Sequence, residues 1–305
     1  MSMARWSLAG ILVLFLLISA SFSISDKVVF LDVGQGDAIL LQSGINQVLI
    51  DGGQGAMVLE RLSEEMPWYD RKIEVVIATH PDRDHLEGLV HVLENYDVRL
   101  VLLPHMPHTS QLQKAWLTQL QTLVEAKEID YRFGWRGQQL NVGSHVAIQL
   151  LGPFSQQGNI VAPGRKTNNA AVLTRVDFQG MSFLLTSDAE APVEQMLIQQ
   201  TEPNMLDVDV LKAGHHGSKT STTASLLRAV SPKIAVISVG ADNTYGHPHP
   251  TVLGRLKGIP TLRTDEAGSV RFVYGGKNWV LQCGSTKLFS GLFRESQCIS
   301  SIARK

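Results

Sequence analysis

The sequence has few cysteines, almost no net charge and no repeated segment. Only Cys283 and Cys298 occur among 305 residues, which is too few for a disulfide scaffold or for a zinc site made of four thiolates. The formal net charge is −1, so no global attraction to nucleic acid exists, and such a partner must be bound by a local patch. An apolar share of 44% with a charged share of 18% is ordinary for a globular protein and excludes wholesale disorder.

Nucleotide-binding loops are also absent. The run GQGDAI at 34–39 lacks the third glycine of a dinucleotide-binding fingerprint, and no P-loop pattern occurs. No Pro/Ser-rich linker divides the chain. Its length therefore fits one large domain or two small ones.

The first residues resemble a targeting segment. Met1–Arg5 carries one positive charge, and Trp6–Ser23 contains no charged residue. A basic start followed by an uninterrupted apolar run is typical of a secretory signal peptide or an uncleaved N-terminal anchor, whereas a buried core helix seldom begins this way. Residues 1–23 are therefore predicted to export the protein, to the periplasm or outside the cell, with membrane attachment through the apolar run if it is retained. Outside the cytoplasm Cys283 and Cys298 could pair.

From Lys27 onward, short apolar runs typical of strands alternate with helical stretches. Strands are predicted at 28–33, 38–42, 47–51, 73–79, 98–104, 146–152, 170–178, 181–188, 207–214, 233–240 and 269–274. Helices are predicted near 85–95, 111–128, 190–200, 221–230 and 250–257, and a loop at 155–166. Strands and helices in both halves, without a linker, predict two sheets packed face to face with helices outside.

One segment concentrates metal-binding side chains. Residues 79–85 (THPDRDH) directly follow an apolar strand and hold four such side chains. Pro81 favours an extended conformation at His80, so that His80 and Asp82 project to the same side. Asp84 suits the start of the following helix. Two adjacent ligand pairs of this kind could hold two metals, and the alternative is a solvated loop with a capping aspartate.

Similar side chains recur where other predicted strands end. Asp188 ends the strand LLTSD, the pair His215 and His216 follows DVLKAG, and His247 follows IAVISVG. Repetition at several strand ends is not expected of purely structural loops, and it indicates one shared site. A second interpretation remains for His247 and for His249, which neighbouring prolines could fix as loop structure.

Two lysines flank the histidine pair. Lys212 precedes it and Lys219 follows it. Either could hold a substrate phosphate, and the alternative for each is an ordinary solvated lysine.

Together these segments resemble the metallo-β-lactamase superfamily. Residues 80–85 are similar to its H-x-[HD]-x-D-H signature. The chain is more similar still to the hydrolase domain of the ComEC competence proteins and its free-standing relatives. The motifs that carry this resemblance run in the family's order: LDVGQGDAILLQ (31–42), LIDGG (49–53), ATHPDRDHLEG (78–88), TNNAAVL (167–173), LLTSD (184–188), LKAGHHGSKTST (211–222) and NTYGHPHP (243–250).

The resemblance implies an α/β fold, the four-layer αββα metallo-β-lactamase sandwich. This hydrolase domain would span residues 24–282, with a C-terminal tail at 283–305. ComEC proteins contain many membrane helices that form a channel, whereas this chain has one N-terminal apolar segment. We therefore do not expect it to be a DNA channel by itself.

The resemblance also assigns ligands by motif position. His80 and Asp82 would hold a first metal, Asp84 and His85 a second, and Asp188 would bridge the two. One of His215 and His216 would complete the second position, with His215 slightly preferred.

Two further polar positions follow from the resemblance. Asn168 or Asn169 stands where many lactamase-type relatives have a metal-binding histidine, and Asn169 is included among the candidate ligands. Asp51 matches a buried aspartate that orients the site from behind the ligands.

The replacement of histidines by Asp82 and an asparagine makes the first position rich in oxygen. This shifts its preference from zinc toward manganese or magnesium. We expect one or two divalent metals, zinc or manganese, with magnesium as a further option.

The implied reaction is hydrolysis of a phosphodiester, possible substrates being DNA and small phosphodiesters, by a hydroxide that the metals hold. Asp84, His247, Lys212 and Lys219 are the catalytic candidates. A β-lactamase is disfavoured by the altered first position. The alternatives are a hydrolase of another ester or amide, and a non-catalytic binding module on the same scaffold.

Overall fold

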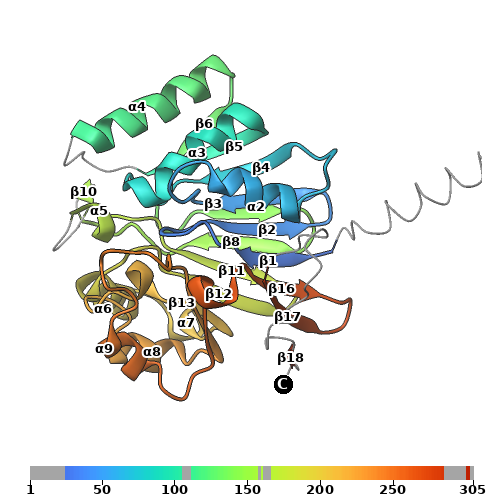
Figure 1. Ribbon diagram of the computed structural model, residues 1–305. Helices are drawn as coiled ribbons and strands as arrows, with labels where there is room; N and C mark the ends of the chain where they lie inside the picture. Colours follow the sequence, from blue (N-terminus) through green and yellow to red (C-terminus); the bar gives the residue numbers. More distant parts are fainter. Residues whose placement is uncertain (1–24, 105–110, 157–158, 161–165, 285–299, 303–305) are drawn as a thin grey trace, which may run out of the picture.

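Two β-sheets lie at the centre of the protein (Figure 1). The structure is a computed structural model, and it describes residues 25–104, 111–156, 159–160, 166–284 and 300–302. Its strands are β1 (Lys27–Phe30), β2 (Ile39–Ser43), β3 (Asn46–Ile50), β4 (Lys72–Ile77), β5 (Asp97–Pro104), β6 (Asp130–Gly134), β7 (Gln139–Val142), β8 (Val146–Leu150), β9 (Ser155–Gln156), β10 (Asn159–Ile160), β11 (Thr174–Phe178), β12 (Met181–Leu185), β13 (Val210–Lys212), β14 (Ile234–Ile237), β15 (Thr261–Arg263), β16 (Val270–Tyr274), β17 (Trp279–Cys283) and β18 (Ser300–Ile302). Its helices are α2 (Met57–Glu65), α3 (Arg83–Asn95), α4 (Gln111–Ala126), α5 (Lys166–Asn169), α6 (Ala191–Gln200), α7 (Pro203–Leu206), α8 (Ala224–Val230), α9 (Pro250–Arg255) and α10 (Thr264–Ala267), with a 3₁₀ turn η1 (Gly214–Gly217).

The strand order defines the two sheets. One sheet runs β18-β17-β16-β1-β2-β3-β4-β5-β6 and the other β15-β14-β13-β12-β11-β8-β7, beside a small β9-β10 pair. β1, β2 and β3 form an antiparallel meander. From β3 to β6, and from β12 to β15, neighbouring strands are parallel.

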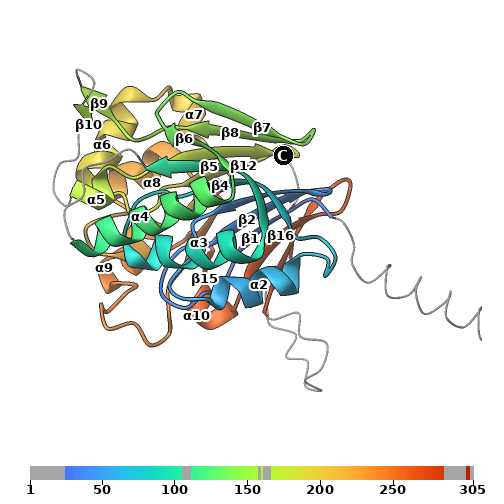
Figure 2. The same cartoon turned by 90° about the horizontal axis from the view of Figure 1, so that it is seen from above.

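Three apolar clusters hold four layers together. The first lies between the two sheets. The second lies between the larger sheet and α2, α3 and α4, which cover its outer face in Figure 2. The third lies between the smaller sheet and α6, α7, α8 and α9. The architecture is therefore the αββα sandwich that the sequence predicts.

Burial on both faces explains why the central strands read as continuous apolar runs. In β1, Val28 and Phe30 contact the cluster between the sheets, whereas Val29 contacts the cluster beneath the helices. Strands covered on both faces lack the alternation of polar and apolar residues that marks a half-exposed strand. This pattern made them recognisable in the sequence.

The structure departs from the expected elements at several points. The helices α2, α5, α7 and α10 and the strands β6, β7, β15 and β17 were not predicted. The predicted loop at 155–166 contains the β9-β10 pair. The predicted tail contains β18, which pairs with β17, so the larger sheet continues past residue 283.

The predicted targeting segment at 1–23 lies outside the described residues. No helix in the described part of the chain is long and apolar enough to span a membrane. Cys283 is disulfide-bonded, and Cys298 also lies outside the described residues.

Candidate metal centre

The candidate ligands meet at one edge of the sandwich, where parallel strands of both sheets end. Asp51 follows β3, and His80 lies three residues after the last residue of β4. From the smaller sheet, Asp188 follows β12 and the His215-His216 pair follows β13. Loops after the carboxyl ends of parallel strands are the usual place for a site in α/β proteins. The expected convergence of these residues is confirmed by their mutual distances.

The predicted 79–85 segment turns from β4 into α3. Asp82 takes the position before the helix, with extended backbone (φ −73°, ψ 148°), and α3 begins at Arg83. Its carboxylate does not cap the helix, because Oδ1 accepts a hydrogen bond from Gln113 of α4 at 2.7 Å. The Oδ2 atom of Asp82 lies 3.8 Å from Nε2 of His80, so the two side chains face the same space as predicted.

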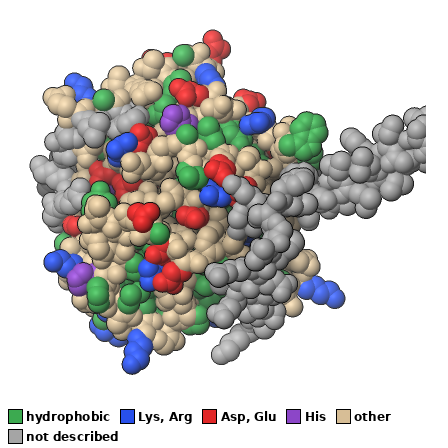
Figure 3. All heavy atoms as spheres, viewed as in Figure 1, with side chains coloured by type: hydrophobic (Ala, Val, Ile, Leu, Met, Phe, Trp, Pro, Cys, Tyr) green, Lys and Arg blue, Asp and Glu red, His purple; other side chains and the backbone are tan. Residues whose placement is uncertain are grey.

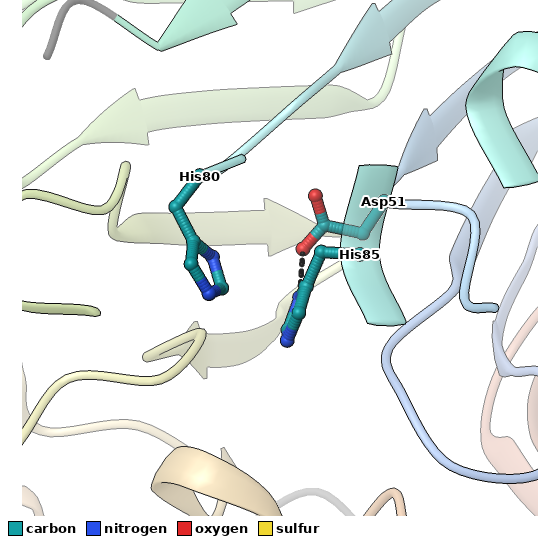
Figure 4. A group of neighbouring side chains, drawn as sticks. All are labelled: Asp51, His80 and His85. Carbon is teal, nitrogen blue, oxygen red and sulfur yellow. Dashed lines mark hydrogen bonds and ion pairs between the residues drawn. The ribbon is translucent and has the colours of Figure 1, made fainter. Parts of the chain in front are cut away.

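Hydrogen bonds fix which ring nitrogen of each histidine faces the centre. His85 Nδ1 lies 2.8 Å from Oδ2 of Asp51, the contact drawn in Figure 4. Thr79 donates its hydroxyl proton to the same Asp51 oxygen, so its own oxygen accepts from Nδ1 of His80 at 3.0 Å. His216 Nδ1 donates to the carbonyl oxygen of Ser238 at 2.9 Å. With Nδ1 protonated, each ring presents the lone pair of Nε2.

Four buried atoms that could coordinate a metal are left without a hydrogen bond. They are Nε2 of His80, His85 and His216, and Oδ1 of Asp188. Burial of polar atoms without partners is costly, and it recurs at sites that hold an ion. Imidazole nitrogens and carboxylate oxygens are the donors that divalent transition metals prefer. This donor set therefore fits a metal.

The tightest group comprises Asp84, His85, Asp188 and His216. His216 Nε2 lies 3.3 Å from Oδ2 of Asp84 and 3.5 Å from Oδ1 of Asp188. His85 Nε2 lies 3.4 Å from the same Asp188 atom. Tetrahedral zinc with bonds of about 2.1 Å requires neighbouring donors about 3.4 Å apart, which these distances match.

A second group shares Asp188 through its other oxygen. Oδ2 of Asp188 lies 3.9 Å from Nε2 of His80 and 3.7 Å from Nε2 of His215. These separations, like that between His80 and Asp82, are wider than those in the first group. Asp188 thus faces both groups, in agreement with its predicted bridging place.

The structure separates the two adjacent histidines. His216, rather than the preferred His215, lies with Asp84 and His85. Both residues have left-handed backbone, with φ of 48° at His215 and 52° at His216, and their rings lie 6.2 Å apart. Asp51 (φ 59°) and Ser187 (φ 48°) share this unfavourable conformation. Such backbone costs about 1–3 kcal/mol per residue and persists where the surroundings enforce it, commonly at functional sites.

Close charges set the ionisation of the carboxylates. Burial alone would raise the pKa of Asp84, but His216 and His85 hold it well below its usual range. The pKa of Asp188 is also lowered, because His216 and His85 outweigh its burial. Conversely, burial would lower the pKa of His85, but Asp188 and Asp51 raise it. The carboxylates are therefore ionised at neutral pH.

Lys212 occupies a different place from the one expected. Its side chain is fully buried, and its ammonium contacts Asp37 and donates to the Ser187 carbonyl at 2.8 Å. Asp37 also lies 3.6 Å from Nδ1 of His216. Lys212 thus balances carboxylate charge behind the ligands and does not reach solvent, where a substrate phosphate would bind. Lys219 is exposed, and its predicted contact with phosphate stays a prediction.

The two candidate asparagines also differ. Asn169 donates to a carboxylate oxygen of Glu190 at 3.1 Å and accepts from the Glu190 amide at 2.9 Å. The fully buried Asn168 has its amide nitrogen 3.4 Å from Nε2 of His215. The geometry therefore favours Asn168 over Asn169 as the asparagine beside the ligands.

His247 lies at the rim of the site. Its ring is 5.5 Å from that of His215 and stacks on exposed Tyr245 at 5.8 Å. Burial, together with His215 and His216, lowers the pKa of His247 to about 4, so the ring is neutral at neutral pH. His249 instead caps α9 from the position before the helix, where its Nδ1 accepts a hydrogen bond from the Thr251 amide.

A comparison with known families decides the classification. The profile of the metallo-beta-lactamase superfamily matches residues 31–241. The chain belongs to the metallo-β-lactamase superfamily. All ligand groups described above lie within the matched residues.

The similar curated proteins are larger. The chain is 31% identical over 294 residues to ComE operon protein 3 of Bacillus subtilis, covering 86% of this chain and 35% of that protein. It is 31% identical over 265 residues to Recombination protein 2 of Haemophilus influenzae, covering 84% of this chain and 30% of that protein. The chain thus spans about a third of these relatives, and the resemblance to the ComEC proteins is confirmed.

A solved structure supports the fold alone. The metallo-beta-lactamase fold protein YhfI from Bacillus subtilis superposes with a TM-score of 0.50 at 14% identity. The match covers 78% of this chain and 95% of that one.

Several residues of the site were not identified from the sequence. Asp37 lies in the 31–42 motif, but the sequence did not mark it as a site residue. Thr79, Ser187 and Ser238 contact the candidate ligands through hydrogen bonds. Gln113 is 31 residues from Asp82 along the chain. Lys212 at the end of the apolar strand β13 could have indicated a buried carboxylate partner, because a lysine is seldom buried without one. Nothing in the sequence indicated Gln113.

Proposed function

We propose that this metallo-β-lactamase-fold protein is a divalent-metal hydrolase that cleaves phosphodiester bonds. The observation that carries the proposal is the convergence of the Nε2 atoms of His80, His85 and His216 on Asp188, all buried and without hydrogen-bond partners. A module that only binds a protein partner has no need to keep these atoms unsatisfied. The fold and the metal-site geometry therefore favour an enzyme.

The ligand groups suit a metal that acts as Lewis acid. Asp84, His85, Asp188 and His216 would hold one ion, and His80 and Asp82 would hold a second with Asp188 between them. When bound, such ions polarise a phosphoryl oxygen and make hydroxide available near neutral pH. Lys212 and Asp37 support the ligands from behind, and Asp51 keeps His85 and Thr79 in place.

Residues at the rim would position the substrate. His247 is neutral at neutral pH, so it would orient a phosphate oxygen through an N–H group rather than by charge. Lys219, which is exposed beside the histidine turn, would supply positive charge for the phosphate.

The names of two relatives support DNA as the substrate. One has a name that refers to recombination, and another, of Neisseria gonorrhoeae, is named a competence protein. The net charge of −1 gives no independent support, so a local patch must provide affinity for a polymer. We also propose that the protein is exported, since its N-terminal sequence is that of a targeting segment.

The test compares two substrates with one active-site variant. Full-length protein, stripped of metal and resupplied with manganese, is incubated with single-stranded circular DNA and with an aryl phosphodiester. Asp84→Ala removes a ligand, and Asp130→Ala, an exposed aspartate at the opposite edge, is the matched control.

Each outcome has a defined meaning. DNA cleavage by the native chain and by Asp130→Ala, but not by Asp84→Ala, establishes a metallonuclease. Ester cleavage without DNA cleavage establishes a phosphodiesterase for small molecules. Bound metal without either activity directs the search to other esters or amides, and the absence of both metal and activity overturns the proposal.

A further inference from the structure

The described chain begins at the edge of the sandwich opposite the metal centre. Asp26 is held there by its neighbours: its Oδ1 accepts from the Gly44 amide at 3.0 Å, and its carbonyl oxygen accepts from the Tyr274 amide at 2.8 Å. The uncharged segment Trp6–Ser23 therefore joins the fold beside the turn between β2 and β3.

Large apolar side chains are exposed at this same edge. Ile45, in the β2-β3 turn, is 68% exposed, and Trp68 and Tyr69, just before β4, are 68% and 59% exposed. β3 and β4 are parallel, so the residues that precede them lie at one edge. A hydrogen bond of 2.9 Å from Gln47 to Asp70 ties the two segments together. We call Ile45, Trp68 and Tyr69 the apolar edge patch.

Charges of both signs surround the apolar edge patch. Asp70, Arg71 and Lys72 follow it, and exposed Lys277 lies in the turn between β16 and β17. Lys72 is paired with Glu74 at 2.9 Å and stands opposite Asp97 of β5. The guanidinium of Arg71 lies 5.5 Å from the centre of the Tyr96 ring. The exposed apolar side chains thus distinguish this edge, whereas its charge does not.

The metal centre faces the other way. β4 runs for six residues from this edge to the loop that holds His80, a length of about 20 Å. Figure 1 shows this separation, with α5, α6 and α9 around the site at the left and the turn between β16 and β17 at the right. In the same view, Figure 3 shows hydrophobic side chains protruding at the right-hand end.

We propose that the apolar edge patch rests on the surface of a lipid bilayer, with the metal centre directed away from it. Trp and Tyr side chains are enriched at the boundary between lipid and water, because an apolar ring and a polar group suit that depth. This proposal rests on retention of the predicted N-terminal anchor, which ends three residues before Asp26 and would bring this edge to the membrane.

The test reads the environment of single positions in the full chain. Ile45→Cys, Tyr69→Cys and Tyr245→Cys are each labelled with an environment-sensitive fluorophore, without reductant so that disulfide-bonded Cys283 does not react. Tyr245 is the matched control, since it is 68% exposed, like Ile45, but stands beside the metal centre. The unsubstituted chain gives the background of labelling. The proteins are reconstituted in vesicles of equal parts phosphatidylcholine and phosphatidylglycerol, with a lipid-bound quencher.

The proposal requires quenching and a blue shift for the labels at 45 and 69, with neither at 245. No quenching at 45 and 69 would overturn it, and so would equal quenching at all three positions, which would mean that the domain has no fixed orientation. The result is independent of the proposed reaction, because no catalytic activity is measured.

Discussion

At the residue scale, His215 and His216 are neighbours in sequence but contact different groups. His216 contacts Asp84 and Asp188 through Nε2, whereas His215 lies at the rim near His247 and Asn168. Both residues have left-handed backbone, and no pattern of residue types reveals this conformation. For this reason the sequence could narrow the ligand to the pair but could not choose within it.

Replacement of each histidine separates their roles. His216→Ala should weaken metal binding by more than about 100-fold, since loss of even an outer partner of a ligand costs about 10–100-fold. His215→Ala should weaken it less, because its distances to the shared carboxylate are wider. Calorimetric titration of the metal-free variants measures both effects. A larger loss in His215→Ala would show that the ligand was misassigned.

Asp51 tests the layer behind the ligands. Asp51→Asn keeps the shape of the side chain and tolerates the left-handed backbone, but it weakens the acceptor for Thr79 and His85. We expect metal affinity to fall about 10–100-fold while the unfolding temperature changes little. The same titration, combined with thermal unfolding, checks this. Unchanged affinity would mean that Asp51 has no part in orienting His85.

At the element scale, the site depends on close contact between the loop after β3 and helix α3. The Gly52 amide donates to the His85 carbonyl at 2.8 Å, and the Gly88 amide donates to the Gly53 carbonyl at 3.0 Å. A Cβ atom at Gly88 would lie 1.9 Å from the Gly52 carbonyl oxygen. Glycine at this crossing allows α3 to place Asp84 and His85 against Asp51.

Gly88→Ala should therefore destabilise the fold by about 3 kcal/mol or more, because backbone must move to make room. Gly254→Ala is the matched control, since a Cβ there meets no atom within 4 Å and alanine favours the α9 helix. Urea unfolding of both variants gives the two free energies. Equal stability of Gly88→Ala and the native chain would refute the close crossing.

The limits of prediction are also clearest for elements. Apolar runs identified the central strands because both faces are buried. Helix α2 was missed because it buries only Val58, Leu62 and Glu65, which is too few apolar residues to form a recognisable helical pattern. β6 was missed because it is an edge strand whose first four residues are exposed. The segments with candidate ligands were identified because their polar residues directly follow apolar strands. Supporting residues such as Gln113 could not be identified, because their position depends on packing between distant elements.

At the scale of the whole molecule, a buried ion cluster joins helix α2 to the neighbouring strands β1 and β16. Glu65 of α2 bonds to Lys27 of β1 at 2.8 Å and to Arg271 of β16 at 2.6 Å. Burial alone would raise the pKa of Glu65, but Lys27 and Arg271 outweigh it and lower the pKa below the usual 4.5. Ionised Glu65 thus contributes stability above that pH, and the contribution is lost as pH falls through the folded-state value.

Thermal unfolding across pH tests this contribution. The native chain should lose stability below about pH 4.5 more steeply than Glu65→Gln, whose amide cannot titrate. At neutral pH the variant should be the less stable of the two, because it leaves buried Lys27 and Arg271 without their anion. Parallel pH profiles for the two proteins would contradict the account.

The most direct test of the central claim is to locate the metal by anomalous diffraction from crystals of the protein loaded with zinc or manganese. The account predicts a peak within bonding distance of Nε2 of His85, Nε2 of His216 and the carboxylates of Asp84 and Asp188. A peak bonded to other residues, or no peak in a crystal grown with saturating metal, would contradict it.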